Sequence, residues 1–81
     1  MKIRLTLDLV PPGERVIVER LEVSQDIRRR FLDLGLVENT PIECIGRSPS
    51  GDPSAYLIRG AVIAIRKKDC QGIYVRREEL T

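Results

Sequence analysis

The sequence has 81 residues, 42% hydrophobic and 32% charged. We therefore predict one globular domain over residues 1–81, near the lower size limit for a core that folds unaided. Its formal charge of +2 is too small to indicate a nucleic-acid partner by itself. No apolar run approaches the roughly 20 residues of a membrane span, and the charged start lacks the apolar stretch of a signal peptide. We expect a cytoplasmic protein with no direct membrane insertion.

The chain opens on an alternating segment, and its first long strand is predicted after a turn. Residues 5–9 alternate leucine with polar residues, so their leucines would share one face if the segment is extended. Pro11, Pro12 and Gly13 then interrupt regular structure. Residues 15–21 are rich in β-branched side chains and predict the first long strand.

A helix of roughly ten residues is predicted next, because its start, its apolar stripe and its end are all marked. Ser24 is typical of a helix N-cap, and Gly35 of a left-handed C-terminal cap. Between them Ile27, Phe31 and Leu34 recur at helical spacing and predict the side that faces the core.

The second half of the chain predicts more strands, separated by strong turn signals. Arg59 and Gly60 divide two apolar runs and indicate a tight hairpin. The remaining predictions are strands at residues 41–47, 54–59, 61–66 and 73–75, a single helical turn at 67–71, and a charged tail at 76–81. Five short strands with one helix predict a mainly β fold, a small barrel that is closed or nearly closed.

No set of residues suited to catalysis is present. The chain has no histidine, and its acidic residues are scattered among turns and strand edges. It contains no Gly-rich phosphate loop, nucleophile elbow or spaced carboxylate pair. We predict that the protein is not an enzyme.

The two cysteines leave one weak metal hypothesis open. Cys44 and Cys70 are most simply small buried hydrophobic residues. The alternative is a soft-metal pair with Asp69 as a third ligand, although the spacing carries no metal signature. A four-ligand zinc site of Cys and His within one chain is excluded by the composition.

Two segments are candidates for contact with a partner. Arg28, Arg29 and Arg30 project from the outer side of the predicted helix, as a solvated face or as an electrostatic contact with an acidic partner. Nucleic-acid binding would normally add exposed aromatic residues. With Phe31 internal, only Tyr56 and Tyr74 remain, so we expect no nucleic-acid partner.

The loop at residues 48–53 is the second candidate. Pro49 and Pro53 stiffen it, Gly51 can adopt a positive φ, and the Asp52 carboxylate can cap nearby amides. The loop is either a rigid connection or a docking surface, since a stiff loop loses little entropy on binding.

These segments together resemble the ferrous iron transport protein A (FeoA) family. The resemblance runs from about residue 9 to residue 75 and is carried by the order of its pieces. Those pieces are Pro12-Gly13-Glu14, residues 30–36 (RFLDLGL), 49–53 (PSGDP), 64–69 (AIRKKD) and Ile73-Tyr74-Val75. Glu38-Asn39-Thr40 replaces the Pro-Gly-Thr-like turn of many relatives, and Asn39 tolerates a left-handed conformation.

The resemblance implies an SH3-like barrel of about five strands, with one helix between the first two long strands. It further implies a small cytoplasmic accessory or regulatory protein that contacts a FeoB-type ferrous iron transporter. On this basis we predict partner-binding residues in and beyond the helix and in the loop: Arg28, Arg29, Leu36, Pro49, Gly51, Asp52 and Pro53.

Two rival functions stay open at this point. The first is a metal-responsive module related to the C-terminal barrel of metal-dependent repressors, holding Fe²⁺ or Zn²⁺ through Cys44, Cys70 or Asp69. The second is a nucleic-acid-binding small barrel, which would show a steep loss of affinity with salt. An exposed barrel edge also leaves a homo-oligomer open.

Overall fold

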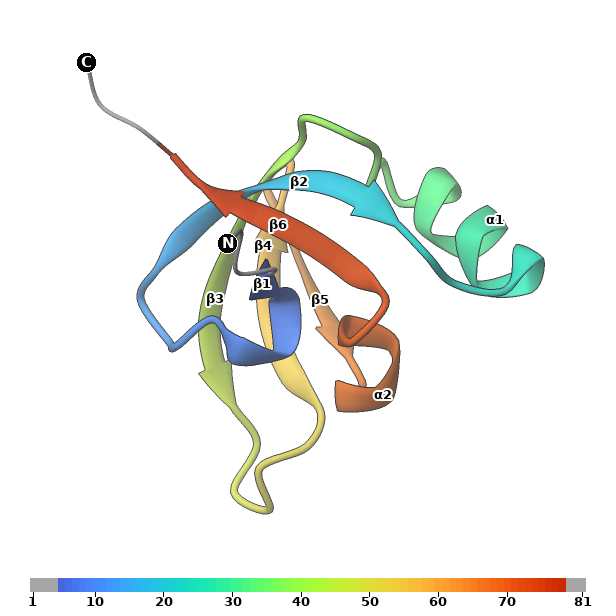
Figure 1. The fold of residues 1–81 in the computed structure, drawn as a ribbon. Helices are drawn as coiled ribbons and strands as arrows, with labels where there is room; N and C mark the ends of the chain where they lie inside the picture. The colour runs from blue at the N-terminus through green and yellow to red at the C-terminus, as the bar shows by residue number, and fades with distance from the viewer. Residues whose placement is uncertain (1–4, 79–81) are drawn as a thin grey trace.

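The computed structural model describes residues 5–78, so the first four residues and the end of the predicted charged tail lie outside it. It is a six-stranded antiparallel sheet with the order β1-β6-β2-β3-β4-β5, which bends so that β2 and β6 cross above β3, β4 and β5 (Figure 1). The strands are β1 (Leu5–Thr6), β2 (Arg15–Leu21), β3 (Pro41–Arg47), β4 (Ser54–Ile58), β5 (Ala61–Ile65) and β6 (Ile73–Arg77).

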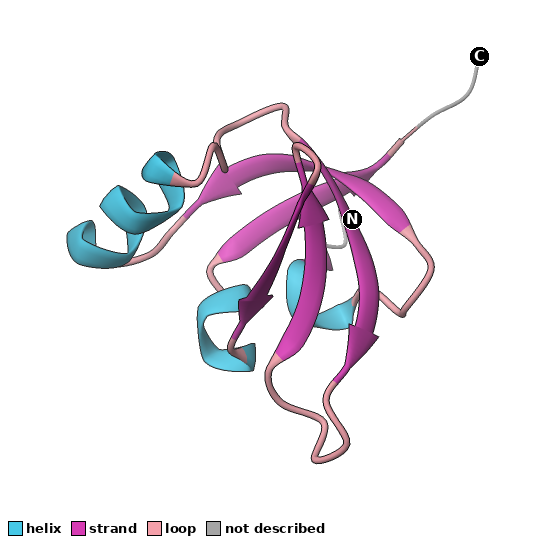
Figure 2. Ribbon diagram, turned by 180° about the vertical axis from the view of Figure 1, so that it is seen from behind, coloured by secondary structure: helices cyan, strands magenta, loops and turns pink. Residues whose placement is uncertain are grey.

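Three short helices complete the chain, and the mainly β prediction with one inserted helix is confirmed. The inserted helix, α1 (Gln25–Asp33), follows β2 and lies to the side of the sheet, at the margin of the molecule in both views (Figures 1 and 2). The single turn α2 (Lys67–Cys70) follows β5, as predicted, and a 3₁₀ helix spans Leu7–Leu9.

The opening segment differs from its prediction. Only Leu5 and Thr6 are extended, and they pair with Val75 and Tyr74 of β6 as a sixth strand that the sequence did not reveal. The Thr6 hydroxyl donates to the Asp8 carboxylate, a local bond that favours a turn over a continued strand. Leu7 is therefore buried while Leu9 is 60% exposed, and the prediction that the leucines share one face is wrong.

The core fills the concave side of the sheet with alternate residues of each long strand. Val16 and Val18 point inward from β2, and Tyr56 is the largest of the fully buried side chains. Fifteen buried hydrophobic residues form one cluster. Ser54 and Thr40 are buried polar residues, and no buried side-chain nitrogen or oxygen among the described residues lacks a hydrogen-bond partner.

Helix α1 begins and ends where the sequence indicates. The Ser24 hydroxyl accepts from the Ile27 amide, and Gly35 adopts φ 85°. The Leu36 amide then donates to the Phe31 carbonyl at 2.8 Å, which is the bond that closes a Schellman motif. This reversal sends Leu36 into the core and leaves Leu34 41% exposed, so the inward placement of Leu34 is wrong.

Two further turns agree with their predictions. Arg59 and Gly60 adopt φ 50° and 83° and join β4 to β5 as a two-residue hairpin. Asn39 adopts φ 70°, so the turn that departs from the family pattern uses the left-handed conformation expected of asparagine.

Candidate functional site: exposed surfaces around a closed core

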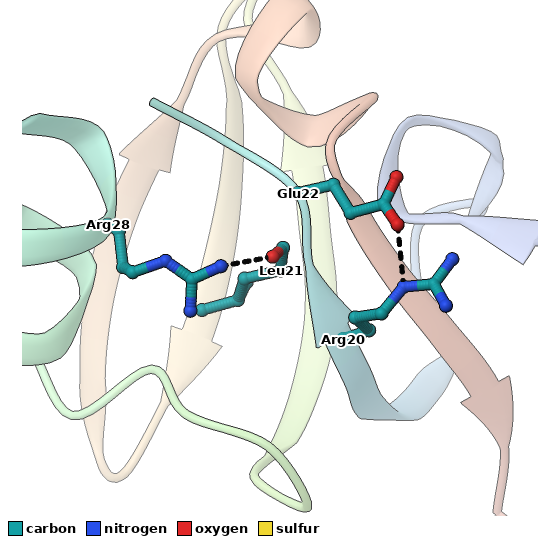
Figure 3. Close-up of polar contacts among 4 residues, drawn as sticks. All are labelled: Arg20, Leu21, Glu22 and Arg28. Atoms are coloured by element: carbon teal, nitrogen blue, oxygen red, sulfur yellow. Dashed lines mark hydrogen bonds and ion pairs between the residues drawn. The ribbon is translucent and has the colours of Figure 1, made fainter. Parts of the chain in front are cut away.

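The α1 arginines do not all have the same environment. The Arg28 guanidinium donates from Nη2 to the Leu21 carbonyl at 2.5 Å and so fastens α1 to the end of β2 (Figure 3). On the other side of that strand end, Arg20 pairs with Glu22 at 2.9 Å. Arg29 is exposed, and no hydrogen bond or ion pair links its side chain to another residue within 5–78. Of the two helix arginines predicted to contact a partner, Arg28 and Arg29, Arg29 is therefore the more available.

Leu36 is 0% exposed and belongs to the core, so the structure removes it from the predicted contact surface. Two leucines near the end of α1 are instead accessible: Leu32 is 50% exposed and Leu34 is 41% exposed. Leu32 lies one helical turn from Arg29, so the two side chains are neighbours. Sequence reasoning missed Leu32, which is next to the core residue Phe31, and it placed Leu34 on the side of the helix that faces the core. We call Arg29, Leu32 and Leu34 the α1 surface.

The loop at residues 48–53 is held by its own hydrogen bonds. The Ser48 amide donates to the Pro53 carbonyl at 3.0 Å, and the Gly51 amide donates to the Ser48 carbonyl at 2.8 Å. Asp52 Oδ1 accepts from the Lys67 amide at 2.8 Å and caps the start of α2, so the amide it caps is distant in sequence and not one of the nearby amides that the sequence suggested. Pro49, Gly51 and Asp52 are exposed, while Pro53 is half-buried.

The structure does not bring α1 and this loop together. The chain leaves α1 before Pro41 and reaches the loop after Arg47, at the other end of β3. A strand of that length spans roughly 20 Å. Both views place the loop and α1 at opposite ends of the molecule (Figures 1 and 2). The predicted contact residues therefore form two surfaces and not one.

The buried thiols do not fit a metal site. Cys44 and Cys70 are both 0% exposed, and Cys70 Sγ donates to Tyr56 Oη at 3.4 Å. Burial raises the pKa of Cys44, and it raises the pKa of Cys70 to about 11, so both carry their protons near neutral pH. Burial also raises the pKa of Tyr56. A cysteine binds a metal ion as its thiolate, not as the protonated thiol.

The third candidate ligand does not change this conclusion. Within residues 5–78, Asp69 joins no group of three side chains suited to hold a metal ion. The weak metal hypothesis therefore lacks a ligand set among the described residues, and Cys44 and Cys70 pack as small core residues, the simpler of the two interpretations.

A shallow groove of about 230 Å³ crosses the outer face of the sheet. Its walls come from adjacent strands, with Arg15 on β2, Pro41, Ile42 and Glu43 on β3, Leu57 on β4 and the Arg59-Gly60 turn. Sequence reasoning could not find it, because the strands are brought side by side only by the fold. Among the described residues, those that line this groove include no thiol and a single carboxylate, that of Glu43.

Within residues 5–78, no helix is long and apolar enough to cross a bilayer. The curved six-stranded sheet and its projecting helix define a small SH3-like barrel that offers surfaces for contact. Residues 5–77 match the FeoA domain. The chain belongs to the FeoA domain family, a family of non-enzymatic accessory proteins associated with ferrous iron transport.

Solved structures of family members share the fold. The FeoA-like protein from Clostridium acetobutylicum is 30% identical over 100% of this chain and 94% of its own, with a TM-score of 0.84. The FeoA protein from Chlorobium tepidum is 29% identical over 90% of this chain and 70% of its own, with a TM-score of 0.86. FeoA from Stenotrophomonas maltophilia, solved as a zinc complex, is 22% identical over 89% of both chains, with a TM-score of 0.78. No curated protein matches the sequence.

Proposed function

We propose that this chain is a cytoplasmic accessory or regulatory protein of ferrous iron uptake that binds the cytoplasmic part of a FeoB-type transporter. The observation that supports this most is the α1 surface. A helix fastened outside the sheet exposes Arg29 beside Leu32, with Leu34 exposed at the end of the helix, and arginine with apolar neighbours is typical of protein interfaces. Membership of the FeoA family supports the link to the iron uptake system.

In this proposal Arg29 is the main charged contact and Leu32 the apolar one. Arg28 contributes through the part of its guanidinium that does not bind Leu21. The stiff loop with Pro49, Gly51, Asp52 and Pro53 is a second contact at the opposite end of the molecule. Function then lies in a coupling free energy between binding and the conformational states of the transporter.

The test is calorimetric titration of the full chain against the cytoplasmic domain of the ferrous iron transporter from the same cell. Arg29→Glu is expected to weaken binding about tenfold or more, because it places like charges at the interface. Arg29→Lys is the matched control, since it keeps the charge at the same site. Absence of binding by the wild-type chain, or equal binding by both variants, contradicts the assignment.

The zinc complex of the Stenotrophomonas maltophilia relative favours a second candidate, a module that responds to a transition metal. Equilibrium dialysis with Fe²⁺ and Zn²⁺ tests it on the wild-type chain and on the Cys44→Ser and Cys70→Ser variants. Stoichiometric binding that either substitution removes would support this candidate. The protonated, buried thiols predict no such binding.

A further inference from the structure

The strand β5 forms one end of the sheet and carries an unusual combination of features. Its five residues, Ala61–Ile65, are all apolar, and β4 is the one strand it pairs with among those described. Val62 is 64% exposed, and Ala64 is exposed as well. The strand at the other end of the sheet, β1, has two residues. Natural proteins usually protect an edge by shortness, charge, proline or a bulge, and β5 shows none of these.

The hairpin turn fixes which backbone groups of β5 are free. A two-residue turn makes Ile58 and Ala61 a hydrogen-bonded pair, and such pairs alternate along an antiparallel ladder. Ala61, Ile63 and Ile65 therefore direct their amides and carbonyls to β4. Val62 and Ala64 direct theirs away from the sheet, where no described strand receives them.

Arginines stand at both ends of this edge. Arg59 precedes β5 in the turn, and Arg66 follows it at the start of α2; both are exposed. Arg59 uses Nε to bind the Gly35 carbonyl, and its terminal nitrogens have no described partner. Neither arginine forms an ion pair within residues 5–78, although Glu43 lines the same groove as Arg59.

We propose that β5 accepts an extended segment of a partner protein as an added strand, with an apolar centre and acidic residues at its ends. The backbone groups of Val62 and Ala64 would supply the ladder, and Arg59 and Arg66 would select the acidic ends. This surface differs from the α1 surface, so the proposal stands independently of the transporter contact.

In the register that would pair all five residues of β5, charge argues against a second copy of this chain as the occupant. An antiparallel pairing of two β5 strands centred on Ile63 would set Arg59 opposite Lys67 of the second copy, and Arg66 against the other hairpin turn. Like charges that face each other across a strand pair are destabilising. A segment with acidic residues at its ends would instead place opposite charges against Arg59 and Arg66.

The test uses the ¹⁵N-labelled full chain and a short synthetic peptide of alternating valine and threonine between pairs of glutamates. Matched peptides carry lysine pairs at the ends or a proline at the centre. We expect the glutamate peptide to shift the amide signals of Val62 and Ala64 and to bind about tenfold more tightly than the lysine peptide. The proline peptide should not bind, because it cannot continue a ladder.

Variants of the chain complete the design. Val62→Pro removes an outward backbone amide and should abolish peptide binding. Val62→Thr keeps this amide, so it should still bind the peptide. Arg66→Glu should remove most of the preference for the glutamate peptide over the lysine peptide, because Arg59 alone then favours acidic ends; this readout does not need the proline variant to fold. Arg29→Glu should leave peptide binding unchanged. Signals that move on α1 instead, no saturable binding, an unchanged preference in Arg66→Glu, or dimerisation through β5 without peptide would each overturn the proposal.

Discussion

Gly72 is the position where the structure leaves least room for a side chain. It lies directly before β6, and its carbonyl accepts from the Glu22 amide at 2.7 Å. A Cβ added there would overlap the Glu22 carbonyl oxygen and lie 2.7 Å from Val23 Cγ1. Because the nearest obstacle is backbone, a change of rotamer cannot relieve the overlap. Gly72→Ala must therefore move the end of β2 away from the start of β6.

The cost of this movement can be estimated from two contributions. Overpacking a tight contact costs about 1–3 kcal/mol. Weakening the bond between the Glu22 amide and the Gly72 carbonyl costs about 0.5–1.5 kcal/mol more. We expect Gly72→Ala to lower the free energy of unfolding by about 2–4 kcal/mol, which for a chain of this size is a fall in Tm of about 10–30 °C.

Urea unfolding followed by circular dichroism measures the change, with Gly46→Ala as the matched control. A Cβ at Gly46 would meet nothing within 4 Å, and its φ is not left-handed. The control should therefore stay within about 0.5 kcal/mol of the wild type. If Gly72→Ala is as stable as Gly46→Ala, the close approach of Gly72 to Glu22 is refuted.

Three further predictions concern single contacts, all measured by urea unfolding. Asp52→Ala should cost about 0.5–2 kcal/mol because it uncaps the Lys67 amide, whereas Asp52→Asn should cost less. Arg28→Ala should cost about 1 kcal/mol because it leaves the Leu21 carbonyl without this donor. The pKa of Cys70 is about 11 in the fold and ordinarily 9.0, so the unfolded chain loses the proton first. The contribution of Cys70 to the free energy of unfolding should therefore be complete below about pH 9 and be lost towards pH 11. The free energy of unfolding should fall less with pH in Cys70→Ala, and the same fall in the variant and the wild type would contradict this.

The parts of the fold that the sequence predicted are those with local causes. Ser24 caps α1 through a bond three residues away, and the φ values of Arg59 and Gly60 belong to the turn itself. The sixth strand has a distant cause, because Leu5 pairs with Val75 at the far end of the chain. A strand of two residues is too short to show a pattern from which its pairing with β6 could be predicted. Leu36 was misplaced because the reversal at Gly35 changes which side of the chain faces the core.

The candidate surfaces likewise combine features that the local sequence predicts with features that depend on the whole fold. Charge runs and prolines identify exposed residues such as Arg29 and Pro49, but they say nothing of how far apart those residues lie in space. The five residues of β5 read like a buried central strand, since all are apolar. Their exposure follows from the sheet order, which places β5 at an end. Sheet order is a property of the whole chain, so pattern alone could not separate a core strand from an open edge.

Arg59 shows how the two exposed regions are physically joined. A residue other than glycine at φ 50° costs of order 1 kcal/mol, so its side chain must offset that cost. The offset is visible in the Nε bond to the Gly35 carbonyl, 2.8 Å long, which holds the end of α1 against the β4–β5 hairpin. The bare Gly35 leaves room for this contact: a Cβ there would lie 2.7 Å from Arg59 Cδ, so the arginine side chain would have to shift. The same arginine that stands at the end of the β5 edge therefore also positions the helix that carries Arg29 and Leu32.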